Sequence, residues 1–470
     1  MNKTKIVCTM GPSCNTLEII KEMMKSGMRV ARFNMSHGTH ESHKAQMDLV
    51  KQARKELDLP VSIMVDTKGP EIRIKQFKNG KVNLQKGQVF LLTTEAVEGD
   101  ESIVSVTYKK LPSILNPGVK ILLNDGLIEL TVDSVDGNIV KTVVSVGGEL
   151  SNNKSINIPG VSLEMDYLSD VDKKDIAFGV EQGVDCYSIS FVNTAQDVED
   201  VRKYLNELGD TKSFIISKIE SAQGVKNMDS IIEASDGVMV ARGDMGVEIP
   251  FEKLPYIQKQ IISKSNKLGK LTITATQMLE SMVSNPRPTR AEISDVANAI
   301  YDGTSAIMLS GETSAGKYPV LTIKTMRKIA VETEKKLKDE NASIGCFSAA
   351  NDVTSGIGYA ACSLASSLSV KAILVTTNLG NSANCICRFR PKTTVIALTP
   401  NERVYYKLGM FWGITPLLDK KCSTTDELLK SARDRAKECG YVSVGDVVIQ
   451  TAGLIANGRG SNMLVVSEIN

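Results

Sequence analysis

Short apolar runs recur along the chain, and most are followed by a segment with helical periodicity. The runs are rich in Val, Ile, Met and Thr, a pattern typical of strands buried on both faces. Outside one long interruption there are eight, at 4–10, 28–34, 61–67, 184–191, 213–220, 237–244, 271–276 and 304–312. Helical patterns follow, for example at 17–27, 195–209, 253–269 and 319–337. Eight alternations predict a (β/α)8 TIM barrel, with a doubly wound open sheet as the competing arrangement.

The alternation is interrupted once, between residues 70 and 169. Here the helical period disappears, and strand patterns are joined by tight Asp-Gly, Gly-Asn and Gly-Gly turns. We therefore predict a small all-β domain of β-barrel type, inserted after the third strand, and a barrel built from 1–69 and 170–341. Because the insertion lies on the ligand face of the barrel, it would act as a lid.

A third domain is predicted over 342–470, where the alternation of helix and strand restarts. Helical patterns lie at 355–368, 382–390 and 424–440, and strand patterns at 371–377, 393–399, 445–453 and 462–469. The fold class is therefore α/β throughout, with an all-β insertion.

Composition narrows the class of protein. A chain of 470 residues suits about three domains. The 56 Lys and Arg nearly balance the 54 Asp and Glu, which gives nucleic-acid binding no support. No apolar run approaches the roughly 18 residues that span a bilayer, and the N-terminus lacks a signal core. Nine scattered cysteines without a CxxC pair are typical of reduced thiols, so we expect a cytoplasmic protein.

Polar residues collect where the predicted strands end, which in a barrel is the ligand face. One charged strand end is typical of a structural ion pair, but six of the eight ends carry polar side chains, which favours a functional site. They are Arg32, Asn34, Ser36 and His37 (second strand), Asp66, Thr67, Lys68, Glu71 and Arg73 (third), Lys218 and Glu220 (fifth), Arg242, Gly243 and Asp244 (sixth), Thr276 and Gln277 (seventh), and Ser310 and Glu312 (eighth).

The charges at these ends suit phosphate chemistry with a metal. Glu220 and Asp244 offer hard oxygen ligands of the kind that magnesium prefers. Arg32, Arg73 and Lys218 would converge on the same mouth, and cations with a metal neutralise a phosphoryl group in transfer.

A second set of strand-end oxygens carries less charge. Asn34, Ser36, Asp66 and Thr67 offer one carboxylate and several neutral oxygens, which would suit a large monovalent cation. Turn capping by the same residue types is the alternative, and the sequence leaves it open.

Two glycine motifs resemble nucleotide-binding loops without matching them. The segment 311–318 approaches a P-loop, but Tyr318 replaces the Ser or Thr that binds magnesium. The segment 356–361 resembles a dinucleotide fingerprint, but it lies inside a helical run and does not follow a strand.

All three histidines, His37, His40 and His43, fall within seven residues. A zinc site would need further ligands at suitable spacing, and only Glu41 is near, so the start of a surface helix is the favoured interpretation. With histidine so scarce, proton transfer would use Lys218, Thr276 with Ser310, or a metal-bound water.

Over nearly its whole length the chain resembles the pyruvate kinase family. The segments KIVCTMGPS, RFNMSHG, DTKGPEIR, ISKIE, ASDGVMVARGDMGVEIP, TATQMLESM, NPRPTRAE, DVANAI and MLSGET stand in the family's order and spacing. The resemblance implies a barrel, a β-domain that closes over the site and a C-terminal α/β domain, usually in a homotetramer. It implies transfer of a phosphoryl group from phosphoenolpyruvate to ADP in glycolysis, followed by protonation of the enolate to pyruvate, with Mg2+ (or Mn2+) and K+ as cofactors.

The resemblance also assigns roles to residues. It implies that Arg32 and Lys218 hold and stabilise the phosphoryl group, and that Glu220 and Asp244 bind magnesium. It implies that the carboxylate end of the substrate is bound by Gly243, Asp244 and Thr276, and that potassium is bound by Asn34, Ser36, Asp66 and Thr67. Nucleotide phosphates would be bound by Arg73, Lys154 and the turn of Asn34, Met35, Ser36 and His37. A proton relay is implied for Thr276 and Ser310. Glu71 matches the glutamate of potassium-dependent members.

Two regions bear on regulation and nucleotide contact. Asn193 and Thr194 stand where many members carry an Arg-Lys pair near the nucleotide, which puts one phosphate contact in doubt. Thr377, Ser382 and Arg459 lie where allosteric members bind a sugar phosphate such as fructose 1,6-bisphosphate, and a plain surface loop is the alternative.

Two other function classes compete with the kinase. A barrel lyase or aldolase acting on pyruvate or phosphoenolpyruvate would also need a magnesium-bound enolate, but it has no use for Arg73, Lys154 or a nucleotide lid. A non-catalytic metabolite sensor would be expected to have lost Lys218, Glu220 or Asp244, and all three are present.

Overall fold

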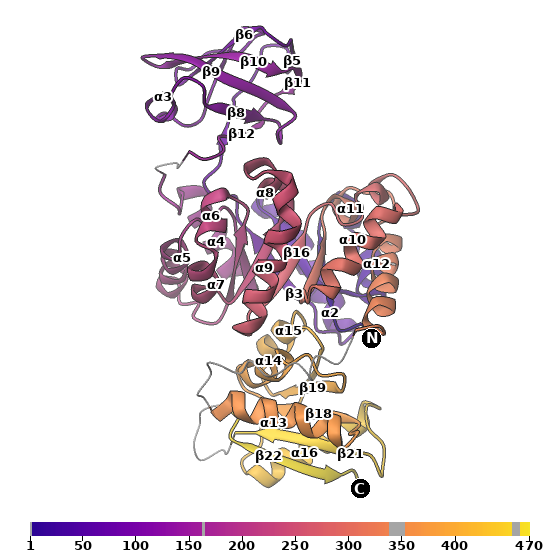
Figure 1. Cartoon of the computed structure of the whole chain (residues 1–470). Coiled ribbons are helices and arrows are strands. Elements are labelled where there is room, and N and C mark those ends of the chain that lie inside the picture. The colour runs from indigo at the N-terminus through magenta and orange to yellow at the C-terminus, as the bar shows by residue number, and fades with distance from the viewer. Residues whose placement is uncertain (1, 162–164, 338–352, 454–460) are drawn as a thin grey trace.

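Eight parallel strands form a closed barrel at the centre of the molecule (Figure 1). The computed structural model describes residues 2–161, 165–337, 353–453 and 461–470. The barrel order is β1-β17-β16-β15-β14-β13-β3-β2. The bounds are Lys5–Thr9 (β1), Met28–Asn34 (β2), Ser62–Asp66 (β3), Cys186–Ile189 (β13), Phe214–Ile219 (β14), Gly237–Ala241 (β15), Leu271–Ala275 (β16) and Ala306–Leu309 (β17). All eight predicted runs supply a barrel strand, so the TIM-barrel prediction is confirmed over the open sheet.

Helices surround the barrel, and several begin at a Ser or Thr whose side chain accepts from an amide of the first turn, as at Thr16, Thr39, Ser169, Thr194 and Thr289. The helices are Leu17–Ser26 (α1), His40–Glu56 (α2), Asp170–Gln182 (α4), Ala195–Glu207 (α5), Ala222–Lys226 (α6), Met228–Ala234 (α7), Arg242–Glu248 (α8), Leu254–Lys267 (α9), Arg290–Tyr301 (α10), Gly311–Ser314 (α11) and Pro319–Glu334 (α12). Short 3-10 turns lie at Pro12–Cys14 (η1), Phe251–Lys253 (η2) and Glu280–Val283 (η3).

The all-β insertion stands beyond the barrel mouth (Figure 1). Seven strands form a sheet in the order β4-β12-β8-β9-β10-β6-β7, and β11 pairs with β5. The two outer edges of the larger sheet meet at the bridge between Ile74 and Val106, so the sheet curls back on itself. The bounds are Ile72–Arg73 (β4), Lys81–Leu84 (β5), Val89–Thr93 (β6), Ile103–Ser105 (β7), Lys120–Leu123 (β8), Ile128–Asp136 (β9), Ile139–Val146 (β10), Gly148–Ser151 (β11) and Ser155–Asn157 (β12), with a helical turn at Leu111–Ile114 (α3).

The C-terminal domain is a five-stranded sheet in the order β20-β19-β18-β21-β22, with β22 antiparallel. The bounds are Val353–Ser367 (α13), Ala372–Thr376 (β18), Asn381–Cys387 (α14), Thr394–Thr399 (β19), Glu402–Leu408 (α15), Ile414–Leu418 (β20), Thr425–Glu438 (α16), Val447–Ala452 (β21) and Met463–Glu468 (β22). Helix α15 and strand β20 were not predicted from the sequence. Pro416 interrupts the short run of β20, and a proline is tolerated there because β20 is an edge strand.

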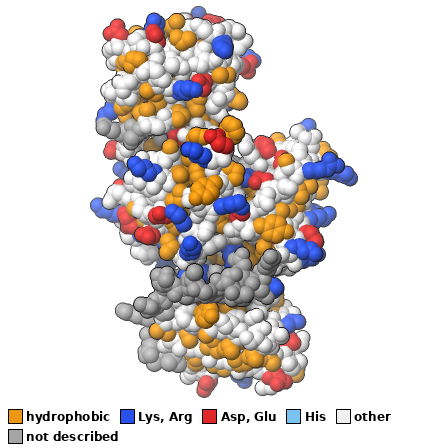
Figure 2. Space-filling view, viewed as in Figure 1, with side chains coloured by type: hydrophobic (Ala, Val, Ile, Leu, Met, Phe, Trp, Pro, Cys, Tyr) orange, Lys and Arg blue, Asp and Glu red, His pale blue; other side chains and the backbone are white. Residues whose placement is uncertain are grey.

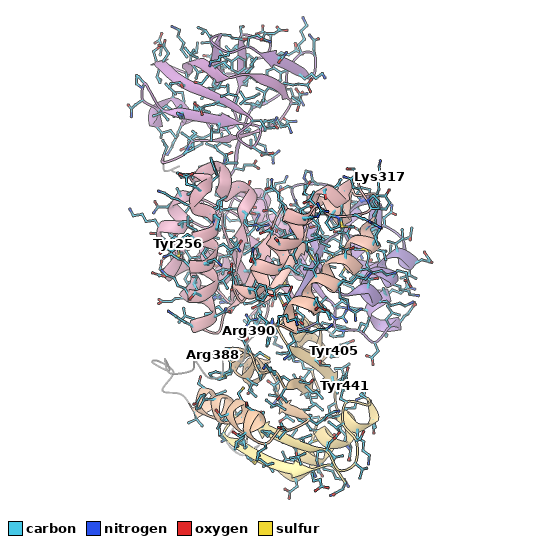
Figure 3. The ribbon with its side chains drawn as sticks, turned by 45° about the vertical axis from the view of Figure 1, so that its right-hand side comes forward. Tyr256, Lys317, Arg388, Arg390, Tyr405 and Tyr441 are labelled. Carbon is cyan, nitrogen blue, oxygen red and sulfur yellow. The ribbon has the colours of Figure 1, made fainter. Side chains whose placement is uncertain are left out.

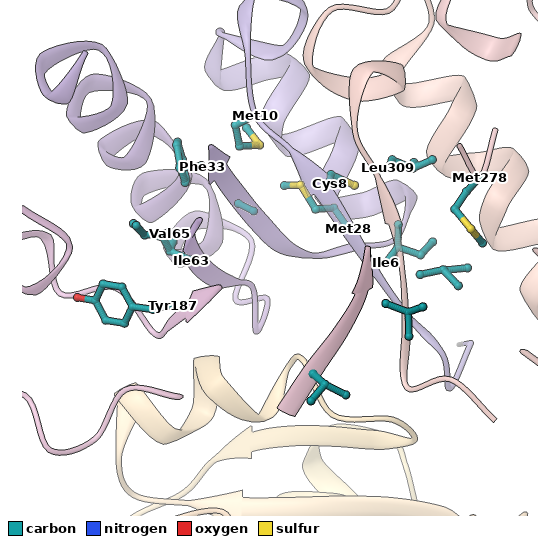
Figure 4. Packing of buried hydrophobic residues seen from close by; sticks show 14 of the residues in the cluster. Ile6, Cys8, Met10, Met28, Phe33, Ile63, Val65, Tyr187, Met278 and Leu309 are labelled. Atoms are coloured by element: carbon teal, nitrogen blue, oxygen red, sulfur yellow. The ribbon is translucent and has the colours of Figure 1, made fainter. Parts of the chain in front are cut away.

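Two packing regions explain why the barrel has one open end. Ile6, Cys8, Met28 and Phe33 belong to the core between the barrel strands and their helices (Figure 4). Buried residues of the barrel interior instead form one contiguous cluster with residues of the C-terminal domain. Arg388, Arg390 and Tyr405 lie along this seam, with Lys317 at the far end of the barrel (Figure 3). The C-terminal domain therefore closes the bottom of the barrel, and the carboxyl ends of the strands are left for chemistry.

A buried ion pair near the seam gives a test of the fold. Arg54 Nη1 lies 3.1 Å from Asp185 Oδ2 and donates to the carbonyl of Val61. Arg54→Met would leave the Asp185 carboxylate buried without its cation, so we expect a loss of about 3–5 kcal/mol in the free energy of unfolding. Urea denaturation measures it, with Lys55→Met, an exposed neighbour on α2, as the control. Equal midpoints for the two variants would contradict the assigned role of the pair.

Candidate active site

A buried lysine lies at the centre of the barrel mouth. Lys218, near the end of β14, donates to Ser190 Oγ at 2.7 Å. Its Nζ also lies 3.4 Å from Asp66 Oδ1 and 3.3 Å from Glu220 Oε2. Burial opposes the charge of the amine, but Asp66 and Glu220 outweigh it and raise the pKa of Lys218. The site therefore presents a permanent ammonium group.

Asp66 joins this lysine to an arginine. Arg32 Nε donates to Asp66 Oδ2 at 2.7 Å, and Arg32 Nη1 donates to Thr9 Oγ1 at 2.9 Å. Burial would raise the pKa of the Asp66 carboxyl, but Arg32 and Lys218 together lower it. One ionised carboxylate thus fixes both cations at the mouth. Within the described part of the chain, Arg32 Nη2 has no hydrogen-bond partner and is available to an anion.

Glu220 is fully buried and only half satisfied. Its Oε1 accepts from the amide of Phe191 at 2.7 Å, whereas Oε2 accepts no hydrogen bond from the described residues. Burial raises the pKa of Glu220 to about 7 against the opposing effect of Lys218, and the charge of Asp244 adds to the rise. A buried carboxylate with an oxygen that accepts no hydrogen bond, and with an acidic neighbour, is a donor set that fits a hard divalent cation.

The turn after β15 brings the next three predicted residues together. Gly243 N donates to Thr276 Oγ1 at 2.8 Å, and Asp244 lies in the first turn of α8. Thr276 has a φ of 71°, a left-handed conformation that is strained for a β-branched residue. Arg242 holds it there by donating to the carbonyl of Thr276 at 2.6 Å while pairing with Asp295 at 2.7 Å.

Ser310 is positioned by a second buried glutamate. Glu312 is fully buried and accepts from the amides of Ser310 (2.6 Å) and Leu279 (3.1 Å). It therefore ties the end of β17 to the loop that follows β16. Thr276 and Ser310 follow neighbouring strands, and no hydrogen bond joins their hydroxyls in the structure as described.

The four oxygens proposed for a monovalent cation occupy one corner of the mouth. Strands β2 and β3 pair Asn34 with Asp66, and the amide of Met35 donates to the Asp66 carbonyl at 2.9 Å. Asn34 Oδ1 accepts from Ser36 N at 3.1 Å, so the turn-capping alternative describes part of its role. The cation itself stays a prediction.

The residues expected to meet nucleotide phosphates lie where the insertion joins the barrel. Arg73 pairs with Glu71 at 2.7 Å and donates to the carbonyl of Asn153 at 3.0 Å. The carbonyl of Lys154 accepts from Ile74 N, which places Lys154 beside Arg73 across β4 and β12.

Among the described residues, one polar contact links this part of the insertion to the barrel. Asn157 Nδ2 donates to Glu248 Oε1 at 3.2 Å, and Glu248 is the last residue of α8. The insertion therefore touches the same helix that carries Asp244.

Two residues of the site were missed from the sequence. Ser190 and Thr9 come from the fourth and first strands, whose ends carry no charge, yet they accept from Lys218 and Arg32. Ser190 Oγ also donates to the carbonyl of Thr67 at 2.6 Å. Both lie at the end of a predicted strand, as the other site residues do, so the same criterion applied to all eight strand ends would have found them.

Asn193 and Thr194 have structural partners. Thr194 caps α5, and the Asn193 carbonyl accepts from Asn227 Nδ2 at 2.7 Å. In the C-terminal domain, Thr377 Oγ1 accepts from Gly380 N at 2.9 Å, and Ser382 is buried in α14. Arg459 lies outside the described residues, so the effector site stays a prediction.

The histidines occupy the start of a helix, as favoured. His40 is the first residue of α2, stacks on Phe178 and lies 2.7 Å from Asp175 Oδ1. His43 contacts the carbonyl of His37. Among the residues that the structure describes, no group of three or more His, Cys, Asp or Glu side chains is placed to hold a metal.

Fold and site together define a class of enzyme: a TIM-barrel phosphotransferase, with cations and an under-coordinated carboxylate at the strand ends. Comparison gives the family. The family model for the barrel domain of pyruvate kinase matches residues 1–323, and the model for its alpha/beta domain matches 355–467. The chain belongs to the pyruvate kinase family.

Curated pyruvate kinases are similar to this chain over nearly its whole length. The chain is 45% identical over 472 residues to the pyruvate kinase of Clostridium acetobutylicum, covering 100% of both chains. It is 46% identical to those of Sporosarcina psychrophila and Geobacillus stearothermophilus, covering 99% and 98% of this chain and 80% and 79% of theirs. Enzymes of this family generally need divalent and monovalent cations. In the described part of the chain, no helix is long and apolar enough to cross a membrane.

Ser190 provides a test of the site geometry. Ser190→Ala removes the acceptor of Lys218 and frees the ammonium group to shift, so we expect kcat to fall about 10- to 100-fold. Ser188→Ala is the matched control, because Ser188 is fully buried in the same strand and its Oγ has no hydrogen-bond partner among the described residues. Steady-state kinetics of both variants decides, and similar kcat values would contradict the positioning role of Ser190.

Proposed function

We propose that this chain transfers the phosphoryl group of phosphoenolpyruvate to ADP, giving pyruvate and ATP in glycolysis. The observation that carries the proposal is the 3.3 Å separation of Lys218 Nζ and Glu220 Oε2. It supports a single site in which a fixed ammonium group and a metal ligand face the same migrating phosphorus. A lyase would need the metal but not the cations beside the insertion.

Arg32 and Lys218 would bind the phosphoryl oxygens. Asp66 holds both cations, and their remaining donors would stabilise the charge that spreads over the oxygens during transfer. Gly243, Asp244 and Thr276 would orient the carboxylate end of the substrate, with the start of α8 beside it. Because the cations are held before the substrate arrives, little reorganisation is needed at the moment of transfer.

Glu220 and Asp244 would hold Mg2+ or Mn2+, which supplies positive charge to the phosphoryl and enolate oxygens when bound. Glu220 Oε2 accepts no hydrogen bond from the described residues, which supports this assignment. Asn34, Ser36, Asp66 and Thr67 would hold K+, because together they offer one charge and several neutral oxygens.

Arg73 and Lys154, with the turn of Asn34, Met35, Ser36 and His37, would bind the phosphates of ADP. The position of Arg73 and Lys154 at the joint of the insertion supports a lid that brings cations to the nucleotide when it closes. Asn193 and Thr194 are engaged in capping and loop contacts, so the nucleotide would be held without the Arg-Lys pair.

After the phosphorus–oxygen bond breaks, the enolate carbon must gain a proton. Thr276 and Ser310 would relay it, since their hydroxyls follow adjacent strands at the mouth. Thr276 Oγ1 donates to the carbonyl of Ala275 at 2.5 Å, so the relay needs this hydroxyl to exchange partners.

We further propose a homotetramer in the cytoplasm. Large apolar side chains on the barrel support self-association: Phe251 is 79% exposed and Tyr256 is 65% exposed. Figure 2 shows hydrophobic side chains gathered over the part of the barrel that carries α8 and α9. No disulfide joins any two of the eight described cysteines, which supports a reducing compartment. A sugar phosphate at Thr377, Ser382 and Arg459 stays a proposal for an effector.

A coupled assay for ADP-dependent pyruvate formation tests the activity. Turnover should require phosphoenolpyruvate and ADP together, and it should be lost when the divalent cation is removed by a chelator and restored by Mg2+. Pyruvate formation that does not depend on ADP would contradict the kinase and favour a phosphatase or lyase.

Lys218→Met should lower kcat by at least about 100-fold, because it removes the cation beside the transferred group. Phosphoenolpyruvate should still bind through Arg32, Gly243 and Thr276, as calorimetric titration would show. A variant with kcat near that of the wild type would contradict the role of Lys218.

Glu71→Lys should relax the potassium requirement, because it replaces a carboxylate near the mouth by a fixed positive charge. Glu71→Gln is the control, since it removes the same negative charge without adding a positive one. The potassium requirement of the wild type and of both variants is measured as the initial rate with K+ and with tetramethylammonium in its place. If Glu71→Lys keeps the full requirement, Glu71 is not linked to the monovalent site.

A further inference from the structure

A cavity of about 200 Å³ lies at the seam between the barrel and the C-terminal domain. One wall comes from α5 and from the segments just before β14 and β15. The other comes from the loops after β18 and β19 and from α15. These segments lie at the amino ends of the barrel strands, so the seam cavity is at the opposite end of the barrel from the active site.

The side chains that line the seam cavity carry an excess of positive charge. Four are cations, namely Arg202, Lys212, Arg403 and Lys407, and the carboxylate among the lining residues is Asp236. Asp236 is already engaged, because it pairs with Arg202 at 3.2 Å and accepts from Ile215 N at 2.9 Å. Of the other three cations, Arg403 pairs at 2.8 Å with Asp210, which lies outside the lining, whereas Lys212 and Lys407 have no carboxylate partner among the described residues.

Lys407 is the least satisfied of these cations. It is only 8% exposed, and its Nζ makes one long hydrogen bond, 3.3 Å to the carbonyl of Lys212. The ammonium otherwise packs over the ring of Phe214, 3.8 Å from its centroid. An ammonium group has three donors, so two of them lack a hydrogen-bond partner among the described residues.

Arg403 and Asn401 add further donors. Arg403 bonds to Asp210 and Ser213 through Nη2, which leaves Nε and Nη1 without partners in the described structure. Asn401 Oδ1 accepts from two backbone amides, which leaves its amide nitrogen as a donor. Leu379, 60% exposed, supplies an apolar wall. Several donors around a small space, next to an apolar wall, suit an anion with three or more oxygens on a short carbon chain.

We propose that the seam cavity binds a small phosphate monoester, with its phosphate held by Lys407, Lys212 and Arg403. The site is separate from the catalytic mouth. It shares the loop between Thr377 and Ser382 with the proposed effector cradle, because Leu379 and Asn381 line it, but it takes its cations from the barrel and α15.

The position of the seam cavity implies a regulatory role. Phe214 begins β14, the strand that carries Lys218, and Asp236 directly precedes β15, which leads to Asp244. A ligand that bridges these segments and α15 would fix the C-terminal domain against the two strands that present the catalytic cation and a metal ligand.

Isothermal titration of the full chain with glycerol 3-phosphate tests the proposal. The wild type should bind, and glycerol should not. Lys407→Met should weaken binding at least tenfold while its methylene groups still pack on Phe214. Lys212→Gln should weaken binding at least threefold. Lys212 is exposed, so this variant keeps the test valid even if Lys407→Met does not fold.

Two controls separate this site from the others and from the proposed function. Ser382→Ala and Lys218→Met should both bind glycerol 3-phosphate as the wild type does, whether or not the chain turns over phosphoenolpyruvate. Wild-type affinity in Lys212→Gln, and in Lys407→Met if it folds, would overturn the proposal, as would loss of binding in either control. Inorganic phosphate should bind more weakly than glycerol 3-phosphate, and equal affinity would overturn the monoester in favour of bare phosphate.

Discussion

The catalytic end of this molecule depends on the carboxylate of Asp66. It is almost fully buried and pairs with Arg32 on one oxygen and Lys218 on the other. Two cations brought so close repel each other and are costly to desolvate, so neither would hold its place without a shared anion. Asp66 ends β3, whereas Arg32 and Lys218 belong to β2 and β14. Closure of the barrel brings these three strands together, and the shared carboxylate then fixes the distance between Arg32 and Lys218.

Around this centre most polar groups have hydrogen-bond partners, and two residues at the predicted site stand out. Ser190 and Thr9 each accept a hydrogen bond from one of the two cations, and Glu312 joins the neighbouring strand ends. Glu220 has one oxygen that accepts no hydrogen bond from the described residues, and burial raises its pKa to about 7. Thr276 is the other, since it is held in a strained left-handed conformation by Arg242. An unsatisfied acceptor and a strained residue at one mouth are features that folding alone does not favour, and the proposed binding of a cation and a substrate would account for them.

The two smaller domains act on opposite ends of the barrel. The β-domain contacts the barrel mouth over a small area, where Asn157 donates a hydrogen bond to Glu248. A small polar contact of this kind resists domain motion less than a packed apolar interface does. The C-terminal domain instead shares a continuous apolar cluster with the barrel interior. We therefore expect motion of the β-domain to accompany substrate binding. The C-terminal domain would act on the site through the barrel strands, and the seam cavity offers a place where a ligand would enter that connection.

The sequence by itself determined the elements and the kinds of groups at their ends. The eight barrel strands, the inserted β-domain and the polar strand ends follow from local periodicity, because strands buried on both faces must be apolar and must turn polar where they meet solvent. The sequence did not predict the edge strand β20, because Pro416 interrupts its short apolar run. The hydroxyls of Ser190 and Thr9 lie at strand ends like those of other site residues, but nothing in the sequence shows that they meet Lys218 and Arg32. Only the tertiary structure decided which charges meet, how deeply Glu220 is buried and that a basic cavity forms at the seam. These depend on register and on contacts between residues far apart in the chain, such as Asp66 with Lys218 and Lys407 with Phe214, and spacing along one chain does not encode them.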